Sequence, residues 1–479
     1  MKNNRSQKQM SWTSKDVALI VFTYAINLII VSLLLSGAIF IEHGVRVDMT
    51  TLAHFVVMTA LVLAVIVSYF LFEDRDFLKS PLNSEMLFLI IELSLVICFV
   101  SGKYVETYLR PLPLAALLTL FLTNRRTAVF INFIFCIFIF LFDSFIGTSF
   151  WLGNYPALLM GVTSGFLAIF CMDNVYSRIK LLYMSVIISL PTLVCVAMSI
   201  IEFGGENIIY SLVAGAFSGP LSIASFMILL PVFEVAFRKV SNFKLAEYTD
   251  HKSKIIKKMI QQAPGTFNHS IVVSNIAEAC AIAIGEDALL ARTCAYYHDV
   301  GKLRRPEFFK ENQAGGINPH DDLTPELSAN IIKSHTQDGY NLVTKNRLPK
   351  EIADVCVQHH GTMPILYFYD KAKKYTDGDV DIAQYCYPGP KPQTKISAII
   401  MIADGCEAAA RSLQDRSRSN VKTVVRNIVN DRMALGQFEE CEITLKELNI
   451  IMHTVINNLT GIYHSRIEYP KVNLDGLDM

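Results

Sequence analysis

Residues 208–258 read IIYSLVAGAFSGPLSIASFMILLPVFEVAFRKVSNFKLAEYTDHKSKIIKK, and the chemistry of the chain changes within this stretch. No charged side chain occurs in it before Glu234, whereas lysine and arginine recur from Arg238 onward. An apolar run of this length suits the hydrocarbon core of a membrane, and the charged part suits water. The stretch therefore predicts a boundary between a membrane region and a polar domain.

The composition on the two sides agrees with this boundary. Of the 43 Lys and Arg and 43 Asp and Glu residues, 29 lie in residues 1–240 and 57 in residues 241–479. With 52% hydrophobic and 18% charged residues, the chain is too apolar for an ordinary soluble protein, in which about 25% of residues are charged. The zero net charge argues against a polycationic surface, so we expect no nucleic acid polymer as a partner.

Apolar stretches recur along the first half of the chain. A helix that crosses a bilayer needs about 20 apolar residues, and the stretches that begin at Met86, Leu112 and Ala128 are shorter. We expect a cytoplasmic segment at residues 1–16 and about eight membrane helices in residues 17–237, surrounded by a lipid bilayer. The stretches are 17–41, 52–72, 86–100, 112–122, 128–142, 157–172, 181–201 and 208–233.

The positive charges favour one orientation of these spans. Lysine and arginine accumulate in short cytoplasmic loops, and an even number of spans places both ends of the region on one face. We therefore expect a multi-pass protein of the cell (inner or plasma) membrane, with the N-terminus and the polar domain in the cytoplasm. The opposite loops hold only Arg46, Lys103 and Arg110, and the cytoplasmic loops hold Arg75, Lys79, Arg125, Arg126, Arg178, Lys180, Arg238 and Lys239.

Two acidic residues lie inside the predicted spans. Glu92 is in the middle of one span, and Asp143 is near the outer end of another. An ionisable group at such a depth is costly and is a functional candidate by default. Two isolated carboxylates do not form a relay, however, and Pro220 and Pro231 kink only the last span. A transporter is therefore the less favoured interpretation.

The second half has the periodicity of amphipathic helices. Apolar residues repeat at intervals of three and four, and no convincing alternating strand is found. We predict an all-α protein: a polytopic transmembrane helical region, a juxtamembrane linker helix at 238–262, an all-helical cytoplasmic domain at 263–470 and a C-terminal tail at 471–479. The amphipathic stretches are 271–284, 288–300, 325–335, 350–360, 396–413, 421–433 and 445–462.

Histidine forms an ordered series in this domain, since nine of the eleven histidines follow residue 250. Each one alone is more often a satisfied polar residue than a ligand. The whole set is different, because burying five imidazoles and two carboxylates without partners would cost at least several kcal/mol in total. The series is His269, His298, Asp299, His335, His359, His360 and Asp404.

This series has the chemistry of a metal site. Imidazole with carboxylate suits a first-row metal such as Mn, Fe, Co or Zn. Seven ligands are too many for one ion but suit two ions that share a bridging carboxylate. Two neighbouring metals are the common device for displacement at phosphorus. No phosphate-binding loop, HExxH, GxSxG or GxGxxG motif competes, so the residues predict phosphoester hydrolysis.

Motifs around these residues resemble those of the PgpH-type membrane HD phosphohydrolase family. The sequence YYHDVGKL at 296–303 carries the HD pair of the superfamily, and the resemblance covers residues 240–470 and extends to the multi-span region. It implies an all-helical domain that hydrolyses cyclic di-AMP. The other motifs are NPHDDLTPELSANIIKSHTQDG at 318–339, HHGT at 359–362, YPGPKPQTK at 387–395 and GIYHSRIEYP at 461–470.

The resemblance implies two divalent ions per chain, most simply Mn or Fe. It implies that a metal-bridging hydroxide attacks one phosphorus and gives linear pApA, with His298, Asp299 and Lys302 as catalytic residues and Lys302 beside the substrate phosphate. One ion would be bound by His269, His298, Asp299 and Asp404, and the other by Asp299, His335, His359 and His360.

Four further residues have expected roles near the site. Tyr297, Tyr367 and Tyr387 are candidates to stack on adenine, although each is as readily a core residue. Glu407 lies one helical turn after Asp404 and either orients a ligand histidine or faces solvent.

Three questions stay open at this point. The substrate is cyclic di-AMP or another nucleotide, either cyclic di-GMP or an alarmone, and a nucleotide-binding receptor without catalysis is the remaining alternative. Homo-oligomerisation through the spans is a hypothesis. Longer family members carry a large extracytoplasmic domain between the first two spans, where only residues 42–51 lie here, so regulation by an external ligand at that place is not expected.

Overall fold

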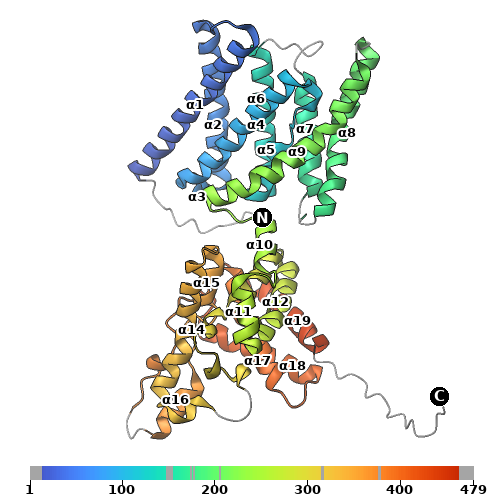
Figure 1. Ribbon diagram of the computed structural model, residues 1–479. Helices are drawn as coiled ribbons and strands as arrows, with labels where there is room; N and C mark the ends of the chain where they lie inside the picture. The colour runs from blue at the N-terminus through green and yellow to red at the C-terminus, as the bar shows by residue number, and fades with distance from the viewer. Residues whose placement is uncertain are drawn as a thin grey trace, which may run out of the picture. The chain divides into compact units, whose positions relative to one another are not determined.

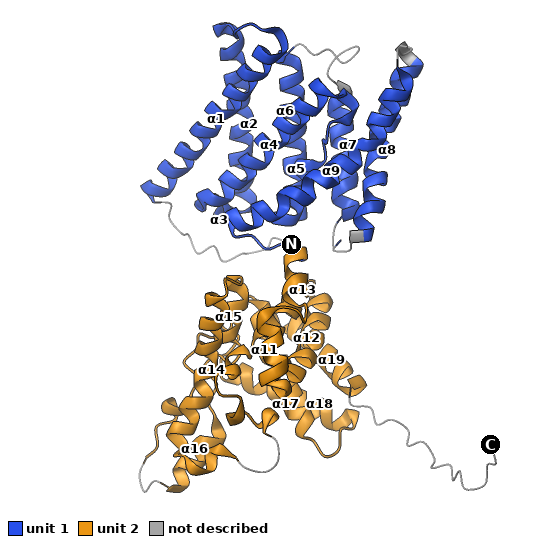
Figure 2. Ribbon diagram, viewed as in Figure 1, with its two compact units in different colours: residues 1–242 blue, residues 243–479 orange. Residues whose placement is uncertain are grey.

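The computed structural model describes residues 13–146, 155–172, 175, 178–203, 207–313, 318–375 and 379–462. The chain divides into two compact units, residues 1–242 and residues 243–479 (Figures 1 and 2). The described residues form helices and turns without a strand, and one isolated bridge joins Pro364 and Cys386. The all-α prediction is confirmed. The expected tail at 471–479 and residues 463–470 of the last motif lie outside the described residues.

The first unit is a set of long apolar helices (Figure 1). Asp48 begins α2 by accepting hydrogen bonds from the amides of Thr50 and Thr51, and Gly44, with φ of 67°, ends α1. The elements are α1 (Ser14–His43), α2 (Met49–Glu73), α3 (Arg75–Lys79), α4 (Pro81–Tyr104), η1 (Thr107–Leu109), α5 (Leu114–Leu122), α6 (Arg125–Ile146), α7 (Tyr155–Met172), α8 (Arg178–Phe203) and α9 (Ile208–Phe237).

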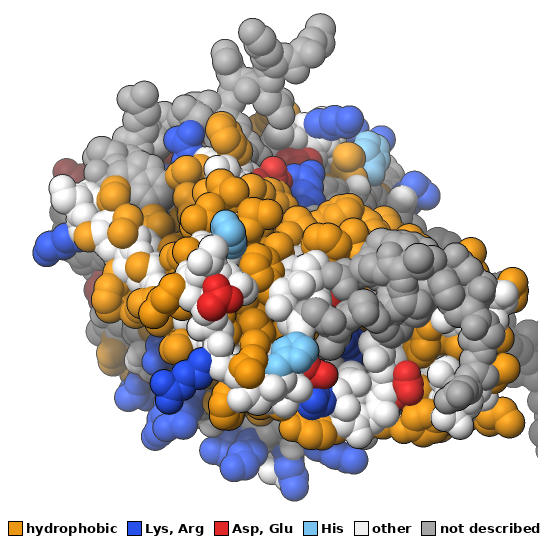
Figure 3. Space-filling model, turned by 90° about the horizontal axis from the view of Figure 1, so that it is seen from above, with side chains coloured by type: hydrophobic (Ala, Val, Ile, Leu, Met, Phe, Trp, Pro, Cys, Tyr) orange, Lys and Arg blue, Asp and Glu red, His pale blue; other side chains and the backbone are white. Residues whose placement is uncertain are grey.

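Six of the eight predicted spans coincide with helices long and apolar enough to cross a membrane, namely α1, α2, α4, α6, α8 and α9. The stretches 112–122 and 157–172 lie in shorter apolar helices. Large apolar side chains are exposed on this unit, among them Phe22, Leu33, Phe72 and Val235, and Figure 3 shows hydrophobic side chains spread over the visible face. Apolar surface of this extent suits contact with lipid.

The weakest predicted span is a short, enclosed helix. Helix α5 has 9 residues, which at a rise of about 1.5 Å per residue cannot cross about 30 Å of hydrocarbon. It packs against α4, α6, α7 and α9, and its residues Leu114 to Thr119 are buried. The irregular chain before it is also buried at Tyr108 and Leu112. Irregular backbone at this depth is tolerated because other helices surround it.

Contacts between helix ends show which ends lie together. Lys103 at the end of α4 forms an ion pair of 2.8 Å with Glu42 at the end of α1. Arg126 at the start of α6 forms one of 2.8 Å with Glu73 at the end of α2. These pairs are those expected when successive spans run in opposite directions, with α5 and the chain before it, residues 107–122, together in the place of the fourth span.

Arg110, which was expected in an outer loop, lies in the non-helical chain between η1 and α5. Its side chain is buried, and Nη1 donates hydrogen bonds of 2.9 and 2.7 Å to the two carboxylate oxygens of Asp143. Gly102 makes room for it, since a Cβ there would collide with the guanidinium. Asp143 is therefore not an isolated carboxylate but half of a buried ion pair.

The second unit contains the predicted amphipathic helices (Figure 2). The expected linker helix is instead two short helices, separated by a turn at residues 249–253. The elements are α10 (Asn242–Tyr248), α11 (Lys254–Gln262), α12 (Pro264–Ile284), α13 (Ala288–Tyr297), η2 (Val300–Arg304), η3 (Pro306–Phe308), η4 (Lys310–Asn312), η5 (Pro319–Asp322), α14 (Pro325–Lys345), α15 (Lys350–Gln358), α16 (Leu366–Tyr375), η6 (Ile382–Tyr385), α17 (Lys395–Ser412), α18 (Arg418–Ala434) and α19 (Leu445–Ile462).

Helix α12 is the centre of this unit. It packs against α13, α17 and α19, and Val273, Ile276, Ala277 and Cys280 are buried in the main core. Its length and composition also match those of a membrane span. In this structure its apolar residues instead form the core that supports a polar cluster at one end of the helix.

Candidate metal centre

The His298–Asp299 pair lies where α13 ends. Tyr297 is the last residue of α13, His298 caps the helix, and the chain enters η2 directly after Asp299. Gly301 in η2 allows α14 to come close, because a Cβ at this position would collide with the carbonyl oxygen of His335. The turn therefore places Asp299 directly against the helix that carries His335.

The other predicted ligands come from four further elements. His269, His335 and Asp404 project from within α12, α14 and α17. His359 and His360 follow the last residue of α15. Residues that are distant in the sequence therefore meet only because these helices pack together.

The Asp299 carboxylate lies between two pairs of imidazoles. Its Oδ1 atom is 3.3 Å from Nε2 of His335 and 3.6 Å from Nε2 of His359. Its Oδ2 atom is 3.2 Å from Nε2 of His298 and 3.7 Å from Nε2 of His269. Each carboxylate oxygen thus faces its own pair of rings, as a bridging ligand must.

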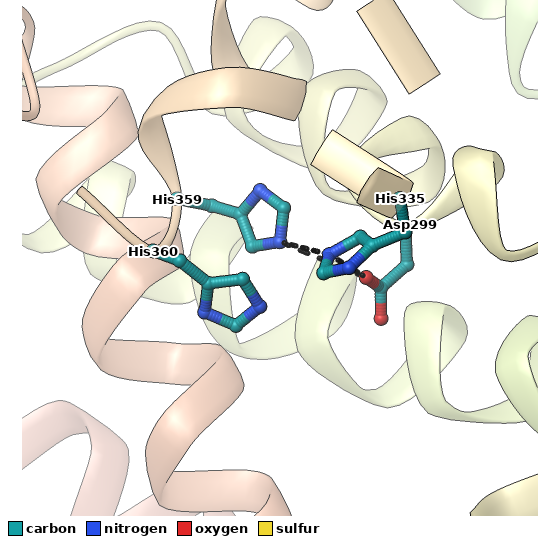
Figure 4. A group of neighbouring side chains, drawn as sticks. All are labelled: Asp299, His335, His359 and His360. Carbon is teal, nitrogen blue, oxygen red and sulfur yellow. Dashed lines mark hydrogen bonds and ion pairs between the residues drawn. The ribbon is translucent and has the colours of Figure 1, made fainter. Parts of the chain in front are cut away.

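All seven predicted ligands are brought together, in two groups that share Asp299. Within each group, one possible ligand atom per residue lies within 4.8 Å of the others. Figure 4 shows the second group, with the rings of His335 and His359 beside the carboxylate of Asp299. The groups are His269, His298, Asp299 and Asp404, and Asp299, His335, His359 and His360.

Hydrogen bonds to the backbone fix the orientation of three rings. The Nδ1 atoms of His298, His335 and His359 lie 2.7, 2.5 and 3.0 Å from backbone carbonyl oxygens three or four residues earlier in the chain. A carbonyl can only accept, so each Nδ1 carries the hydrogen and donates it. The Nε2 atom of each ring then faces the cluster, as a metal ligand requires.

His269 is oriented by a carboxylate instead. Its Nδ1 lies 2.5 Å from Oε2 of Glu407, and its Nε2 lies 3.0 Å from Oδ1 of Asp404. Glu407 is buried, and Arg411 lies 3.4 Å from its Oε2 atom. Of the two interpretations left open for Glu407, the geometry therefore favours contact with a ligand histidine over exposure to solvent.

The buried polar atoms of the cluster fit a cation. Nε2 of His298 and Oδ1 of Asp299 are inaccessible to solvent and make no hydrogen bond. A buried polar atom without a partner costs about 1–3 kcal/mol. The His298 atom lies beside Oδ2 of Asp299 in the first group, and Oδ1 of Asp299 faces His335 and His359 in the second. Both groups contain imidazoles and carboxylates and no thiol. The donor set and its unsatisfied atoms are thus those that a divalent cation would satisfy.

Burial and charge set the protonation of the cluster. Burial lowers the pKa of His335 to about 3 and holds the pKa of His360 well below its ordinary value. Burial alone would lower the pKa of His269, but its bonds to Asp404 and Glu407 raise it to about 9. His335 and His360 are therefore neutral, whereas His269 must release a proton when it becomes a ligand.

Lys302 lies beside the cluster. Its Nζ atom is 2.6 Å from Oδ2 of Asp299 and 2.8 Å from Oε1 of Glu311. Burial alone would raise the pKa of Asp299, but Lys302 and then His298 outweigh burial and hold this pKa well below its ordinary value. Sequence reasoning did not find Glu311, because it lies in a 3-10 turn without a motif or periodicity.

The three tyrosines proposed to contact substrate lie in different surroundings. Tyr387 is half-buried, and its ring stacks on His360 with centroids 4.3 Å apart. Tyr367 is 65% exposed on α16. The expectation for Tyr297 is wrong: the ring is buried in the core, and its hydroxyl donates to the carbonyl of Tyr248 at 2.7 Å. A ring without an exposed face cannot stack on a base.

His320 does not belong to either ligand group. Its ring is buried, with Nε2 2.9 Å from the carbonyl oxygen of Phe308 and the ring against Phe368. Phe368 belongs to a small separate core with Ala329 and Tyr385. His320 therefore packs against the small core beside α16 and does not form part of the metal centre.

Comparisons with known proteins cover both units. Residues 266–409 match the HD domain family, and residues 49–241 match the family described as a 7TM receptor with intracellular HD hydrolase. The chain is 37% identical to the cyclic-di-AMP phosphodiesterase PgpH of Bacillus subtilis over 427 residues, which are 87% of this chain and 59% of that protein. It is 48% identical to the cyclic-di-AMP phosphodiesterase PgpH of Listeria monocytogenes over 50% of this chain and 34% of that protein.

A solved structure matches the second half of the chain. The crystal structure of the L. monocytogenes phosphodiesterase PgpH HD domain in complex with cyclic-di-AMP is 51% identical in sequence, with a TM-score of 0.43, and the match covers 45% of this chain and 99% of that one. The matches to the two curated relatives cover 59% and 34% of those proteins, so this chain spans less than two thirds of either one. It belongs to the PgpH family of multi-pass membrane proteins, in which a seven-transmembrane receptor region precedes an HD hydrolase domain.

Proposed function

We propose that this chain is a membrane-anchored, metal-dependent phosphodiesterase that hydrolyses cyclic di-AMP to linear pApA. The observation that carries the proposal is the position of Asp299 between two groups of imidazoles and carboxylates. Two relatives, at 37% and 48% identity, are cyclic-di-AMP phosphodiesterases by name, which supports cyclic di-AMP as the substrate. The paired ligand groups support the phosphodiester class, and the relatives support adenine as the base.

The two ligand groups would hold two divalent cations, and we propose Mn or Fe because the donors are imidazoles and carboxylates. When bound, such a pair neutralises charge on phosphate oxygens and lowers the pKa of a nucleophilic water. Asp299 would serve both groups through its two oxygens. The backbone bonds to the Nδ1 atoms of His298, His335 and His359 keep these rings in the orientation that binding requires.

The chain itself supplies a positive charge next to this centre. Lys302 is only 13% exposed, and its ammonium lies between Asp299 and Glu311. An ammonium held at a site with little water stabilises negative charge on a phosphate more strongly than it would in bulk water. We therefore propose that Lys302 binds a non-bridging phosphate oxygen of the substrate as the 3′ oxygen departs.

We also propose that the N-terminus and the second unit are cytoplasmic. Arg126 and Glu73 join the start of α6 to the end of α2, on the face that the lysine and arginine distribution assigns to the cytoplasm. A fluorescent-protein fusion at the C-terminus should be bright in cells, and an alkaline phosphatase fusion at the same place should be inactive. The reverse result would contradict this orientation.

The function is tested with the full chain purified in detergent and supplied with Mn²⁺. Cyclic di-AMP should be converted to pApA, identified by mass spectrometry, and His298→Ala and Asp299→Ala should each stop the reaction. Cyclic di-GMP and a guanosine alarmone serve as competing substrates, and faster turnover of either one would change the substrate assignment. Tight binding of cyclic di-AMP without any product would instead support a receptor.

A further inference from the structure

Glu311 is the residue at the metal centre that no motif singles out. Its Oε1 atom lies 2.8 Å from Nζ of Lys302, and both side chains are largely buried, 12% and 13% exposed. Lys302 also contacts Asp299 at 2.6 Å, so its ammonium has two carboxylate partners. Only one of the two, Asp299, belongs to the predicted ligand groups. Glu311 is therefore a carboxylate next to the centre that is not assigned to a cation.

The fold fixes the position of Glu311. Its Oε1 atom accepts a hydrogen bond of 3.2 Å from the hydroxyl of Thr266, and the next residue, Asn312, bonds to the amide and the hydroxyl of Thr266 at 3.1 and 2.8 Å. Gly265 allows this close packing, because a Cβ there would collide with the carbonyl oxygen of Glu311. The loop is thus attached to the first turn of α12, three residues before His269.

The two partners of Lys302 behave differently when cations are present. Oδ2 of Asp299 faces both Lys302 and the rings of His269 and His298, so the ammonium and a cation in the first group compete for the same oxygen. A bound divalent cation would also repel the ammonium. Glu311 takes no part in either group and would continue to attract it.

We propose that Glu311 is a positioning residue that holds the Lys302 ammonium away from the cation-binding oxygen of Asp299 and beside the substrate phosphate. The position of Lys302 beside the phosphate rests on the proposed function, because the phosphate is that of the substrate. The separation of Lys302 from the oxygen of Asp299 concerns only these two residues and a divalent cation. Without Glu311, the ammonium has Asp299 as its remaining ion-pair partner among the described contacts and competes more strongly with the cation.

The test uses the full chain in detergent and titrates it with Mn²⁺ in a calorimeter. Glu311→Gln keeps the size of the side chain and removes its charge. We expect its dissociation constant for the more weakly bound Mn²⁺ to rise about tenfold, equivalent to about 1.4 kcal/mol. With cyclic di-AMP as substrate, KM should rise by a similar factor while kcat changes less, and Glu311→Asp should restore part of both.

The same change made in a protein that lacks the Lys302 ammonium separates a positioning role of Glu311 from a structural one. In Lys302→Gln, the further change Glu311→Gln should leave the Mn²⁺ affinity unchanged, because the ammonium through which Glu311 acts is gone. The matched control is Glu439→Gln, which removes an exposed carboxylate that pairs with Lys391 at 3.0 Å; its affinity and activity should equal those of the wild type.

The outcomes are distinguishable. If Glu311→Gln lowers the Mn²⁺ affinity equally in the wild type and in Lys302→Gln, Glu311 acts through its packing against Thr266. If it lowers the affinity in neither protein, Glu311 does not act on the centre. Either result overturns the proposal. If wild-type protein binds Mn²⁺ but does not cleave cyclic di-AMP, the proposed function fails, whereas the calorimetric test of Glu311 still decides the positioning role.

Discussion

Nδ1 of His269 lies 2.5 Å from Oε2 of Glu407, and both side chains are buried. The two residues come from α12 and α17, so the bond joins two helices of the second unit directly at the metal centre. A carboxylate in this position fixes the ring and increases the basicity of the nitrogen that would bind the cation. Asp404, one helical turn before Glu407, meets the other nitrogen of the same ring.

We predict that Glu407→Gln weakens cation binding by about 10- to 100-fold, because an amide does not stabilise the ring as a carboxylate does. Metal titration of the full chain measures the change. Arg411→Gln is the matched control, since Arg411 lies 3.4 Å from Glu407 and is partly exposed; its effect should be several times smaller. Unchanged affinity in Glu407→Gln would show that Asp404 alone orients the ring.

The shared ligand makes a prediction about stoichiometry. Asp404 belongs to one group and Asp299 to both, so Asp404→Ala should leave about one cation per chain, whereas Asp299→Ala should leave almost none. Inductively coupled plasma mass spectrometry after dialysis gives the count. Asp415→Ala removes an exposed acid of the same unit and should retain two. Equal cation contents in the Asp404 and Asp299 variants would contradict the bridging role.

Much of the second unit could be predicted from the sequence, because helical periodicity and capping residues are local signals. The predicted helical stretch 325–335 lies in α14, and the side chain of Thr324 accepts a hydrogen bond from the amide of Leu327 at the start of this helix. The end of that helix was placed too early. Gly339 lies inside α14, beyond the predicted stretch, and a Cβ at this position would come within 3.2 Å of Cβ of Cys356. Packing between helices, which the pattern does not report, decides the role of this glycine.

The ligand series could be predicted because metal-binding chemistry limits the residue types. Buried residues whose partners are distant in the sequence could not be predicted. Glu311 is bonded to Thr266, 45 residues earlier, and Arg110 is bonded to Asp143, 33 residues later. Nothing near either residue in the sequence indicates its partner. A charge in a loop is usually solvated, but Arg110 is buried and pairs with Asp143.

Tyr387 and Tyr367 give a matched pair for substrate contact. Tyr387 stacks on His360, whereas Tyr367 is 65% exposed and its described ring contact is with Phe368. A base stacked on an aromatic ring gains about 1–3 kcal/mol, so Tyr387→Ala should raise KM for cyclic di-AMP roughly 5- to 150-fold. Tyr387→Phe should preserve KM, and Tyr367→Ala should lie within about twofold of wild type. Steady-state kinetics decides, and a larger effect at Tyr367 would reverse the assignment.

The contact between Lys395 and Glu447 predicts a dependence of stability on pH. The hydrogen bond from Lys395, 2.6 Å long, is the main cause that lowers the pKa of Glu447 from 4.5 to about 2. A carboxyl group with a lowered pKa in the folded state stabilises the fold above its unfolded pKa and loses this contribution as the pH falls through the folded pKa. The contribution should therefore be complete at neutral pH and disappear between pH 4.5 and about 2.

Glu447→Gln removes this titration. Its thermal unfolding midpoint should lie below that of the wild type at neutral pH, and the two midpoints should converge as the pH falls through the same range. Glu439→Gln, at a more exposed ion pair, should follow the wild type throughout. A constant difference between Glu447→Gln and the wild type at all pH values would assign the effect to packing.

The buried pair of Arg110 and Asp143 makes a prediction about the first unit. Both side chains are 8% exposed, and the two hydrogen bonds between them join the chain before α5 to α6. Removing one partner leaves the other charge buried without compensation, which typically costs about 3–5 kcal/mol. Asp143→Asn should therefore lower the thermal unfolding midpoint in detergent markedly. The double variant Arg110→Met with Asp143→Leu should recover most of the loss, because no buried charge remains. If the double variant is as unstable as Asp143→Asn, the geometry of the pair and not its charge holds this segment in place.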